Sequence, residues 1–393
     1  MKILINGYYN FLPKSKATFS GPRNLLESFL VYLDKEGYAY TCLVLMGKKN
    51  KDAKVTKKRI KVGKSSWLVT KLRLNTPDVF GAKKPSIPKS LDGPLFRIKK
   101  VITAEKPDLV FINGMSIANW FIIKAAYELE IPLIVNHLGL WFKEITSYGG
   151  SPAGLKIMRE MEKDSSRLAS KNIFLSKLSY KEFNKGLIKV PKNKYELVFN
   201  PVDNVYTKGR ITKPVKRNNI KIGIVARWDP IKNHKAILKL VKEAKKQRLP
   251  WEFYSVTTLH KKYSWSKDIK DEYEKNINIL RPMTPDKLKK FYEEMNILLL
   301  PSHFDVSPTV VMEAMFRNRT TLISSTVGLA NTYQENGGSD LIVNFSKPKE
   351  VIKKIKKEAY KNPPKKLVKF IKSNYQGKNV YPKYLNIIKS LIK

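Results

Sequence analysis

The segment from Ile297 to Glu313 constrains the fold of this 393-residue chain more than any other part. Its first four residues, Ile-Leu-Leu-Leu, predict a buried strand of a parallel sheet. A short polar loop follows. The Ser307-Pro308 pair then predicts the start of a helix, because serine is a good N-cap and proline is favoured at the first helical position. Strand, loop and helix in this order are typical of α/β folds with parallel sheets.

Two carboxylates bracket the start of this predicted helix, Asp305 in the loop and Glu313 in the second helical turn. The free N–H groups and the dipole of a helix N-terminus favour a phosphate. Carboxylates would repel a phosphate, but they accept hydrogen bonds from sugar hydroxyls. A diphosphate with a sugar at each end suits both kinds of group. The alternative interpretation of such an acid pair is a capped helix with two exposed side chains.

This segment resembles the E-x7-E motif of family 4 retaining glycosyltransferases, with Asp305 in place of the first glutamate. The resemblance implies that Asp305 contacts the donor sugar and Glu313 the nucleotide ribose. It also implies that Ser307, Thr309 and Val310 lie at the donor phosphates. The family has Gly-Phe-Gly after the first acid, whereas this chain has Val-Ser-Pro. The fold implied is GT-B, an α/β architecture of two Rossmann-like domains facing across a cleft.

The N-terminal residues predict a first Rossmann-like half, with a strand at Lys2–Asn6, a helix at Pro22–Glu36 and a strand at Tyr40–Met46. Gly21, just before the helix, resembles part of the family's glycine-rich acceptor-side loop, which also comes near the donor phosphates. A tight turn is the alternative interpretation of a single glycine.

Residues 47–106 have a weaker pattern, from which we predict helices at Ser65–Leu74 and Leu91–Ile102. The first would carry a patch of basic and apolar side chains around Trp67. Such a patch could lie on a membrane or along a nucleic acid. An ordinary surface helix is the alternative.

His137 directly follows a predicted buried strand at Pro132–Asn136. Active sites of open α/β sheets lie at the carboxyl ends of strands. The family has a histidine after this strand, near the transferred sugar, and His137 matches its position. We therefore include His137 among the candidate catalytic residues, with a histidine in a loop as the alternative.

Arg227 and Lys232 follow a predicted strand at Ile220–Ala226 and precede a helix. Placed there, they can converge on one diphosphate, which arginine binds as a fork and lysine as a point charge. The segment resembles the family's Gly-Arg-x4-Lys-Gly, with Ala226 and Asn233 in place of the glycines.

A further loop, Thr326-Val-Gly-Leu, follows a predicted strand at Thr321–Ser324. It resembles the family's next donor-side loop, in which a backbone N–H pair can hold the distal phosphate. The resemblance assigns this role to Gly328 and Leu329.

The predicted domains are an N-terminal acceptor-side domain, residues 1–203, and a C-terminal nucleotide-sugar domain, residues 204–375. Asn-Pro-Val-Asp at 200–203 resembles the family's Asn-Gly-Val-Asp before the interdomain linker, and 207–219 is basic and without periodicity. Residues 376–393 resemble the family's helix that crosses back to the first domain.

The net charge is the most unusual feature of the composition. Lys and Arg number 76 and Asp and Glu 33, which gives +43. Such a surface attracts polyanions, either nucleic acid or anionic lipid. The charge recurs along the chain at 48–64, 208–221, 232–248 and 347–372, so it does not form a tail. A merely solubilising role is the alternative.

Other features of the sequence bear on the cellular compartment and on the cofactors that we expect. The single cysteine, Cys42, forms no intrachain disulfide and fits a reducing compartment. No signal peptide and no apolar run of about 20 residues is visible, which predicts a cytoplasmic protein, soluble or peripheral to a membrane. The sequence has no Asp-x-Asp and no Cys/His cluster with ligand spacing, so we predict neither a metal site nor a tightly bound cofactor.

These features predict a metal-independent retaining glycosyltransferase, hexosyl- or pentosyl-, with a nucleoside-diphosphate sugar as donor and a UDP-sugar expected. Arg227, Lys232 and the helix start would stabilise the departing diphosphate. The charge slightly favours a hydroxymethylated DNA base as acceptor, as in viral DNA glycosylation, over a membrane or lipid-linked glycan. An inactive, basic nucleic-acid-binding module is the alternative from another class.

Overall fold

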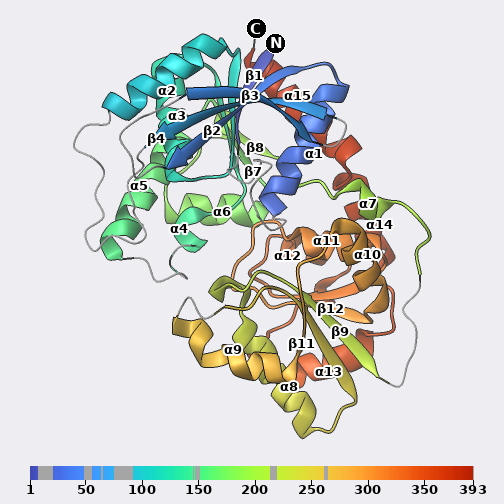
Figure 1. The fold of residues 1–393 in the computed structure, drawn as a ribbon. Coiled ribbons are helices and arrows are strands. Elements are labelled where there is room, and N and C mark those ends of the chain that lie inside the picture. The colour runs from blue at the N-terminus through green and yellow to red at the C-terminus, as the bar shows by residue number, and fades with distance from the viewer. Residues whose placement is uncertain are drawn as a thin grey trace. The chain divides into compact units, whose positions relative to one another are not determined.

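The computed structural model describes residues 1–7, 21–47, 55–62, 65–74, 92–144, 146, 151–212, 219–260 and 264–392. Contacts within the chain define two units (Figure 1). Unit 1 comprises 1–175, 179–198 and 381–393, and unit 2 comprises 176–178 and 199–380. Each unit is built on a largely parallel sheet with helices, so the α/β class predicted from the sequence is confirmed.

Unit 1 contains an eight-stranded sheet in the order β3-β4-β2-β1-β5-β6-β7-β8. The strands are β1 Lys2–Asn6, β2 Ala39–Gly47, β3 Val55–Val62, β4 Ser65–Leu74, β5 Leu109–Asn113, β6 Leu133–His137, β7 Lys171–Phe174 and β8 Tyr195–Leu197. The helices are α1 Gly21–Lys35, α2 Asp92–Glu105, α3 Ile117–Glu128, α4 Trp141–Glu144, α5 Pro152–Leu168 and α6 Lys177–Gly186. Strands β5 and β6 are buried along their whole length, as expected for central parallel strands.

The C-terminal helix, α15 Gly377–Leu391, joins unit 1 from Tyr381 onward. Tyr381 and Tyr384 contact Phe29 of α1, with ring centroids 5.8 and 5.6 Å apart. These two tyrosines of α15 are thereby part of the aromatic core of unit 1.

The helix predicted at Ser65–Leu74 is wrong, because this segment is strand β4. It pairs antiparallel with β3 and parallel with β2. Residues 71–74, Lys-Leu-Arg-Leu, alternate polar and apolar, which is the period of a strand. The helix predicted at Leu91–Ile102 is confirmed as α2.

The buried carboxylate of Glu105, at the end of α2, ties four neighbouring strands together. It accepts hydrogen bonds from Lys2 of β1 (3.0 Å), Thr41 of β2 (3.1 Å) and Thr70 of β4 (3.1 Å), and it pairs with Lys57 of β3 at 2.8 Å. One acid therefore links the β3–β4 hairpin to the rest of the sheet.

Unit 2 contains a five-stranded, all-parallel sheet in the order β11-β10-β9-β12-β13. The strands are β9 Ile220–Val225, β10 Trp251–Val256, β11 Asn278–Leu280, β12 Ile297–Leu300 and β13 Thr320–Ile323. The helices are α7 Asn204–Thr207, α8 His234–Lys246, α9 Ser264–Asn276, α10 Pro285–Glu294, α11 Thr309–Phe316, α12 Ala330–Glu335, α13 Pro348–Glu358 and α14 Lys365–Asn374.

Two groups of helices cover this sheet. Helix α8 packs between α9 and α13, and α11 contacts α10 and α14 (Figure 1). Residues 341–343 form no strand of this sheet. A short 3-10 turn at Ser339–Leu341 and one isolated bridge from Ile342 to Ile323 occupy that place.

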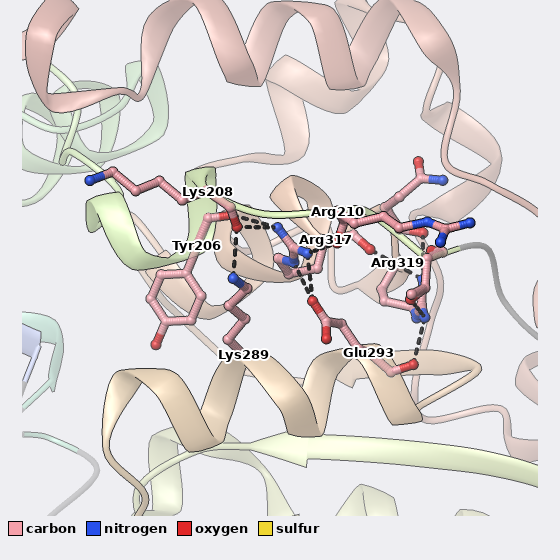
Figure 2. Close-up of polar contacts among 9 residues, drawn as sticks. Tyr206, Lys208, Arg210, Lys289, Glu293, Arg317 and Arg319 are labelled. Atoms are coloured by element: carbon pink, nitrogen blue, oxygen red, sulfur yellow. Dashed lines mark hydrogen bonds and ion pairs between the residues drawn. The ribbon is translucent and has the colours of Figure 1, made fainter.

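Two buried arginines hold the segment 206–212 inside unit 2 (Figure 2). Arg317 donates to the carbonyl oxygens of Tyr206, Lys208 and Arg210. Arg319 donates to the carbonyl and hydroxyl oxygens of Thr212 at 2.7 and 2.9 Å. Half of the segment that the sequence predicts to be a linker is thus fixed to this unit, while residues 213–218 lie outside the described ranges.

Candidate functional site

The candidate site of unit 2 lies where the order of its strands reverses. After β9 the chain moves outward to β10 and β11, then returns to place β12 and β13 on the other side of β9. In open α/β sheets, ligands bind beyond the carboxyl ends of the strands at such a switch point. The loops that follow β9 and β12, together with helix α11, carry most of the site residues predicted from the sequence.

These two loops are tied to each other by hydrogen bonds. The Asn233 side chain donates to the carbonyl of Pro301 at 3.1 Å, and the N–H of His303 donates to the carbonyl of Ile231 at 2.8 Å. Asn233 has φ 56° and ψ 46°, in the left-handed region. Asparagine tolerates this region better than most residues, which explains how it can stand where the resembling family has glycine.

The structure brings Lys232 and Asp305 together at the centre of this site. Lys232 Nζ lies 2.6 Å from Asp305 Oδ2, and each side chain is 15% exposed. Arg227 is exposed and lies 3.4 Å from Asp229. Lys232 is therefore balanced by an acid that an anionic ligand would have to displace, while the Arg227 side chain is exposed to solvent.

The helix after β12 starts later than the sequence predicts. Helix α11 begins at Thr309, with Pro308 as its N-cap and no side-chain cap. The prediction that Ser307 caps the helix is therefore wrong. The N–H of Ser307 instead donates to Asp305 Oδ1 at 3.2 Å, so the aspartate side chain orders the turn before the helix.

Glu313 is half-buried on the second turn of α11, and its carboxylate accepts a hydrogen bond from the Tyr292 hydroxyl at 2.7 Å. Burial raises the pKa of Glu313 to about 7, against the hydrogen bonds from Tyr292 and Thr309, which lower this pKa. The negative charge of Asp203 contributes to this rise. This carboxylate is costly to ionise and gains from any additional hydrogen-bond donor.

A close approach of two loops requires glycine at position 328. Its N–H donates to the Asp305 carbonyl at 2.7 Å, and a Cβ at this position would lie 1.9 Å from the Val306 carbonyl oxygen. The sequence predicts that the N–H groups of Gly328 and Leu329 hold a phosphate. In the structure the Gly328 N–H is already used by Asp305, so the donating pair is not formed. Leu329 is buried at the start of α12.

Sequence reasoning missed two hydroxyl groups at this edge of the sheet and the tyrosine that contacts Glu313. Ser302 follows β12, Thr257 follows β10, and the hydroxyls of both are buried without a partner within the described protein, as is that of Ser307. Buried hydroxyls normally find a partner. Their position directly after predicted strands was the signal that could have identified them. Tyr292, the third missed residue, carries no motif.

His137 is not in a loop but ends strand β6 inside the core of unit 1. It is 0% exposed, its ring stacks on Phe174 at 4.6 Å, and its Nε2 lies 2.9 Å from the side-chain oxygen of Asn172. Burial lowers the pKa of His137 to about 4. A ligand cannot reach this ring as it is packed, so the expectation of an accessible histidine is corrected.

Gly21 is the first residue of α1, and the residues that precede it lie outside the described ranges. In the described part of the chain, no group of three or more His, Cys, Asp or Glu side chains is arranged to hold a metal ion. No helix within the described residues has both the length and the apolar character needed to cross a bilayer.

Residues 219–358 match the family model described as "Glycosyl transferases group 1". The matched region contains the loops after β9, β12 and β13, with Arg227, Lys232, Asp305 and Glu313. No curated protein sequence matches the chain.

Several solved structures are similar over nearly the whole chain. Sucrose-phosphate synthase from Thermosynechococcus elongatus has a TM-score of 0.72 and 14% identity, covering 99% of this chain and 98% of that one. An E. coli structure described as trehalose-6-phosphate bound with UDP-2-fluoro glucose has a TM-score of 0.66 and 12% identity, covering 100% and 99%. The lipopolysaccharide outer core galactosyltransferase WaaB has a TM-score of 0.65 and 12% identity, covering 99% of each chain. The predicted GT-B fold, with two Rossmann-like domains, is confirmed.

Proposed function

We propose that the protein is a retaining glycosyltransferase that uses a nucleoside-diphosphate sugar, with a UDP-sugar expected. The observation that carries this proposal is the arrangement of Lys232, Asp305 and Glu313 around the switch point of unit 2. The match of residues 219–358 to the family of glycosyl transferases group 1 supports it. The bound UDP-2-fluoro glucose of the similar E. coli structure supports a UDP-sugar as the donor.

The site residues divide between the two parts of such a donor. Lys232 and the exposed Arg227 would bind the diphosphate, with the start of α11 at Thr309 and Val310 adding its dipole. When a phosphate reaches Lys232, the ion pair to Asp305 opens. The freed carboxylate can then accept hydrogen bonds from the hydroxyls of the donor sugar.

The ribose would be bound by Glu313. Glu313 lies on the second turn of α11, beyond the loops that carry Arg227 and Lys232. In the contacts described, only hydroxyl groups donate to its carboxylate. A carboxylate accepts hydrogen bonds from two neighbouring hydroxyls, as the 2′ and 3′ positions of a ribose present them.

Transfer would break the bond between the anomeric carbon and the diphosphate oxygen and form a bond from that carbon to the acceptor oxygen. The acceptor's proton passes to the departing diphosphate on the same face of the sugar, which retains the configuration. Arg227 and Lys232 would stabilise the negative charge that builds on the diphosphate. This site does not use the paired carboxylates by which retaining glycosidases form a covalent intermediate.

The charge of +43 supports a polyanionic acceptor. In unit 2, exposed lysines follow one side of α8 at 235, 239, 242 and 246 and one side of α13 at 349, 353 and 356. These two helices contact each other, which brings two rows of exposed lysines into the same part of unit 2. We propose a hydroxymethylated base in DNA as the acceptor. The name of WaaB, a lipopolysaccharide galactosyltransferase, supports a membrane glycan as the second candidate.

Nucleotide release on mixing with a panel of nucleoside-diphosphate sugars tests the transferase assignment. We expect one donor class to be consumed, and we expect Lys232→Met to reduce the rate by about 100-fold, since one charge-stabilising contact is lost. Transfer is then compared on native DNA, hydroxymethylated DNA and vesicles carrying a lipid-linked glycan. Binding of nucleic acid without consumption of any donor would favour the inactive binding module instead.

A further inference from the structure

Helices α10 and α11 are joined at two successive points, and one of these involves the carboxylate of Glu313. Tyr292 of α10 donates to Glu313, and the next residue, Glu293, accepts from Arg317 Nε at 2.8 Å. Arg317 lies four residues beyond Glu313, as the C-cap of α11, so the two contacts lie about one helical turn apart. This pair of contacts fixes the distance between the helices at Glu313.

The second of these contacts, between Arg317 and Glu293, is held in place by further hydrogen bonds. Arg317 is 0% exposed and donates to the carbonyls of Tyr206 and Lys208, at 3.2 and 3.1 Å (Figure 2). Tyr206 of α7 lies with its ring centroid 5.9 Å from that of Tyr292. Helix α7 thereby helps α10 and α11 to enclose the Tyr292 ring, which is completely buried. A side chain packed in this way has few orientations open to it.

We infer that Tyr292 is a positioning residue for nucleotide binding, whose hydroxyl holds the Glu313 carboxylate in the orientation that accepts the ribose hydroxyls. The inference rests on the proposed function and names a residue outside the motifs. The hydroxyl donates to Oε2 of Glu313 and fixes the plane of the carboxylate. The remaining lone pairs then point in a defined direction toward a ligand.

The groups around Glu313 determine how this contact responds to pH. On its own helix, Thr309 donates to it and lowers its pKa, and from α10 Tyr292 does the same. From the segment before α7, the negative Asp203 raises that pKa. Burial raises the pKa of Tyr206, on α7, and the negative charge of Glu313 adds to this rise. Removing the Tyr292 hydroxyl therefore makes Glu313 harder to ionise.

The test is Tyr292→Phe, which keeps the ring and deletes only the hydroxyl. Binding of UDP and of 2′-deoxy-UDP is measured by calorimetry from about pH 6 to about pH 9, a range around the Glu313 pKa. We expect the variant to bind UDP about tenfold more weakly near neutral pH, because a hydrogen bond to a charged group is lost. We also expect a smaller preference for UDP over 2′-deoxy-UDP and a shift of the binding midpoint to higher pH.

Tyr375→Phe is the matched control. Tyr375 is equally buried in unit 2, and its hydroxyl interacts with Thr332, not with Glu313. This variant should keep the wild-type preference and pH midpoint. If Tyr292→Phe also keeps both, the inference is overturned. If the wild-type protein binds neither UDP nor the other nucleoside diphosphates, the proposed function itself fails, whatever Tyr292 does.

Discussion

Glu105 in unit 1 and Glu313 in unit 2 are both carboxylates removed from bulk water, and their environments differ in kind. Glu105 is 4% exposed and is surrounded by Lys2, Lys57 and two threonines. Burial alone would raise the pKa of Glu105, but the hydrogen bonds from these lysines outweigh it and bring the pKa to about 2. For Glu313, burial dominates and the pKa rises to about 7.

The difference indicates that Glu105 stabilises the fold, whereas Glu313 is arranged to bind a ligand. The lysines and threonines around Glu105 satisfy its charge completely, so its ionisation stabilises unit 1. Glu313 has hydroxyl donors from Tyr292 and Thr309 and a repelling neighbour in Asp203. Its ionisation costs stability until a ligand brings more donors, which is the usual conflict between stability and function at a site.

The largest effect should come from Glu105→Ala. The substitution leaves two lysines and two threonines without their partner, so we expect a loss of about 3–5 kcal/mol in the free energy of unfolding. Glu105→Gln should cost less, because the amide still accepts from Thr41 or Thr70. Urea unfolding, with hydrogen exchange to localise the loss to unit 1, measures both. A loss below about 1 kcal/mol for the alanine variant would show that the network is not structural.

Acid should act on the same carboxylate. Since the pKa of Glu105 is lowered in the folded state, its stabilisation is present above the unfolded pKa, about 4.3, and is lost as pH falls toward about 2. We expect about 2–3 kcal/mol over this range, after discounting for the partly exposed Lys57. Glu105→Gln should remove this part of the acid sensitivity. An unchanged dependence on pH in that variant would contradict the assignment.

Glu313→Gln should behave in the opposite way. The pKa of Glu313 is raised in the folded state, so the wild-type protein loses stability as pH rises from about 4.3 through about 7. The glutamine variant lacks this loss. At pH 8 it should be more stable than the wild type by about 1–2 kcal/mol while binding UDP more weakly. If the variant is less stable than the wild type at pH 8, Glu313 stabilises the fold, as Glu105 does.

Chelation should have the smallest effect. If basic groups such as Arg227 and Lys232 stabilise the diphosphate, treatment with EDTA should leave nucleotide release unchanged. The assay compares rates before and after treatment, with magnesium or manganese added back. Loss of activity that either metal restores would contradict this description of the phosphate site.

Much of unit 2 could be predicted because its signals are local. Ile297–Leu300 is a short apolar run bounded by loop residues, and the structure shows a fully buried strand. Lys232 and Asp305 were both identified as site residues, but the contact between them could not be, since 73 residues separate them. Such a pairing depends on the order of strands in the sheet, which local pattern does not determine.

The errors have physical causes that can be named. In β4 a run of mixed basic and apolar residues was interpreted with a helical period, although the last four residues alternate. Ser307 has the right residue type for an N-cap, but the helix begins one residue later than predicted, with Pro308 at the cap, and the Ser307 hydroxyl makes no hydrogen bond within the described protein. Tyr292 was missed because a tyrosine in an amphipathic helix is indistinguishable from a core residue until its partner is known.

We propose that Glu313 stays partly protonated until the ribose of a nucleotide binds it. Proton release on binding of UDP tests this proposal. Calorimetry near pH 7 in buffers of different ionisation enthalpy measures the protons exchanged. We expect the wild type to release about half a proton per UDP more than Glu313→Gln, since a group with a pKa near 7 is about half protonated there. Equal proton exchange in the two proteins, with equal affinity for UDP, would contradict it.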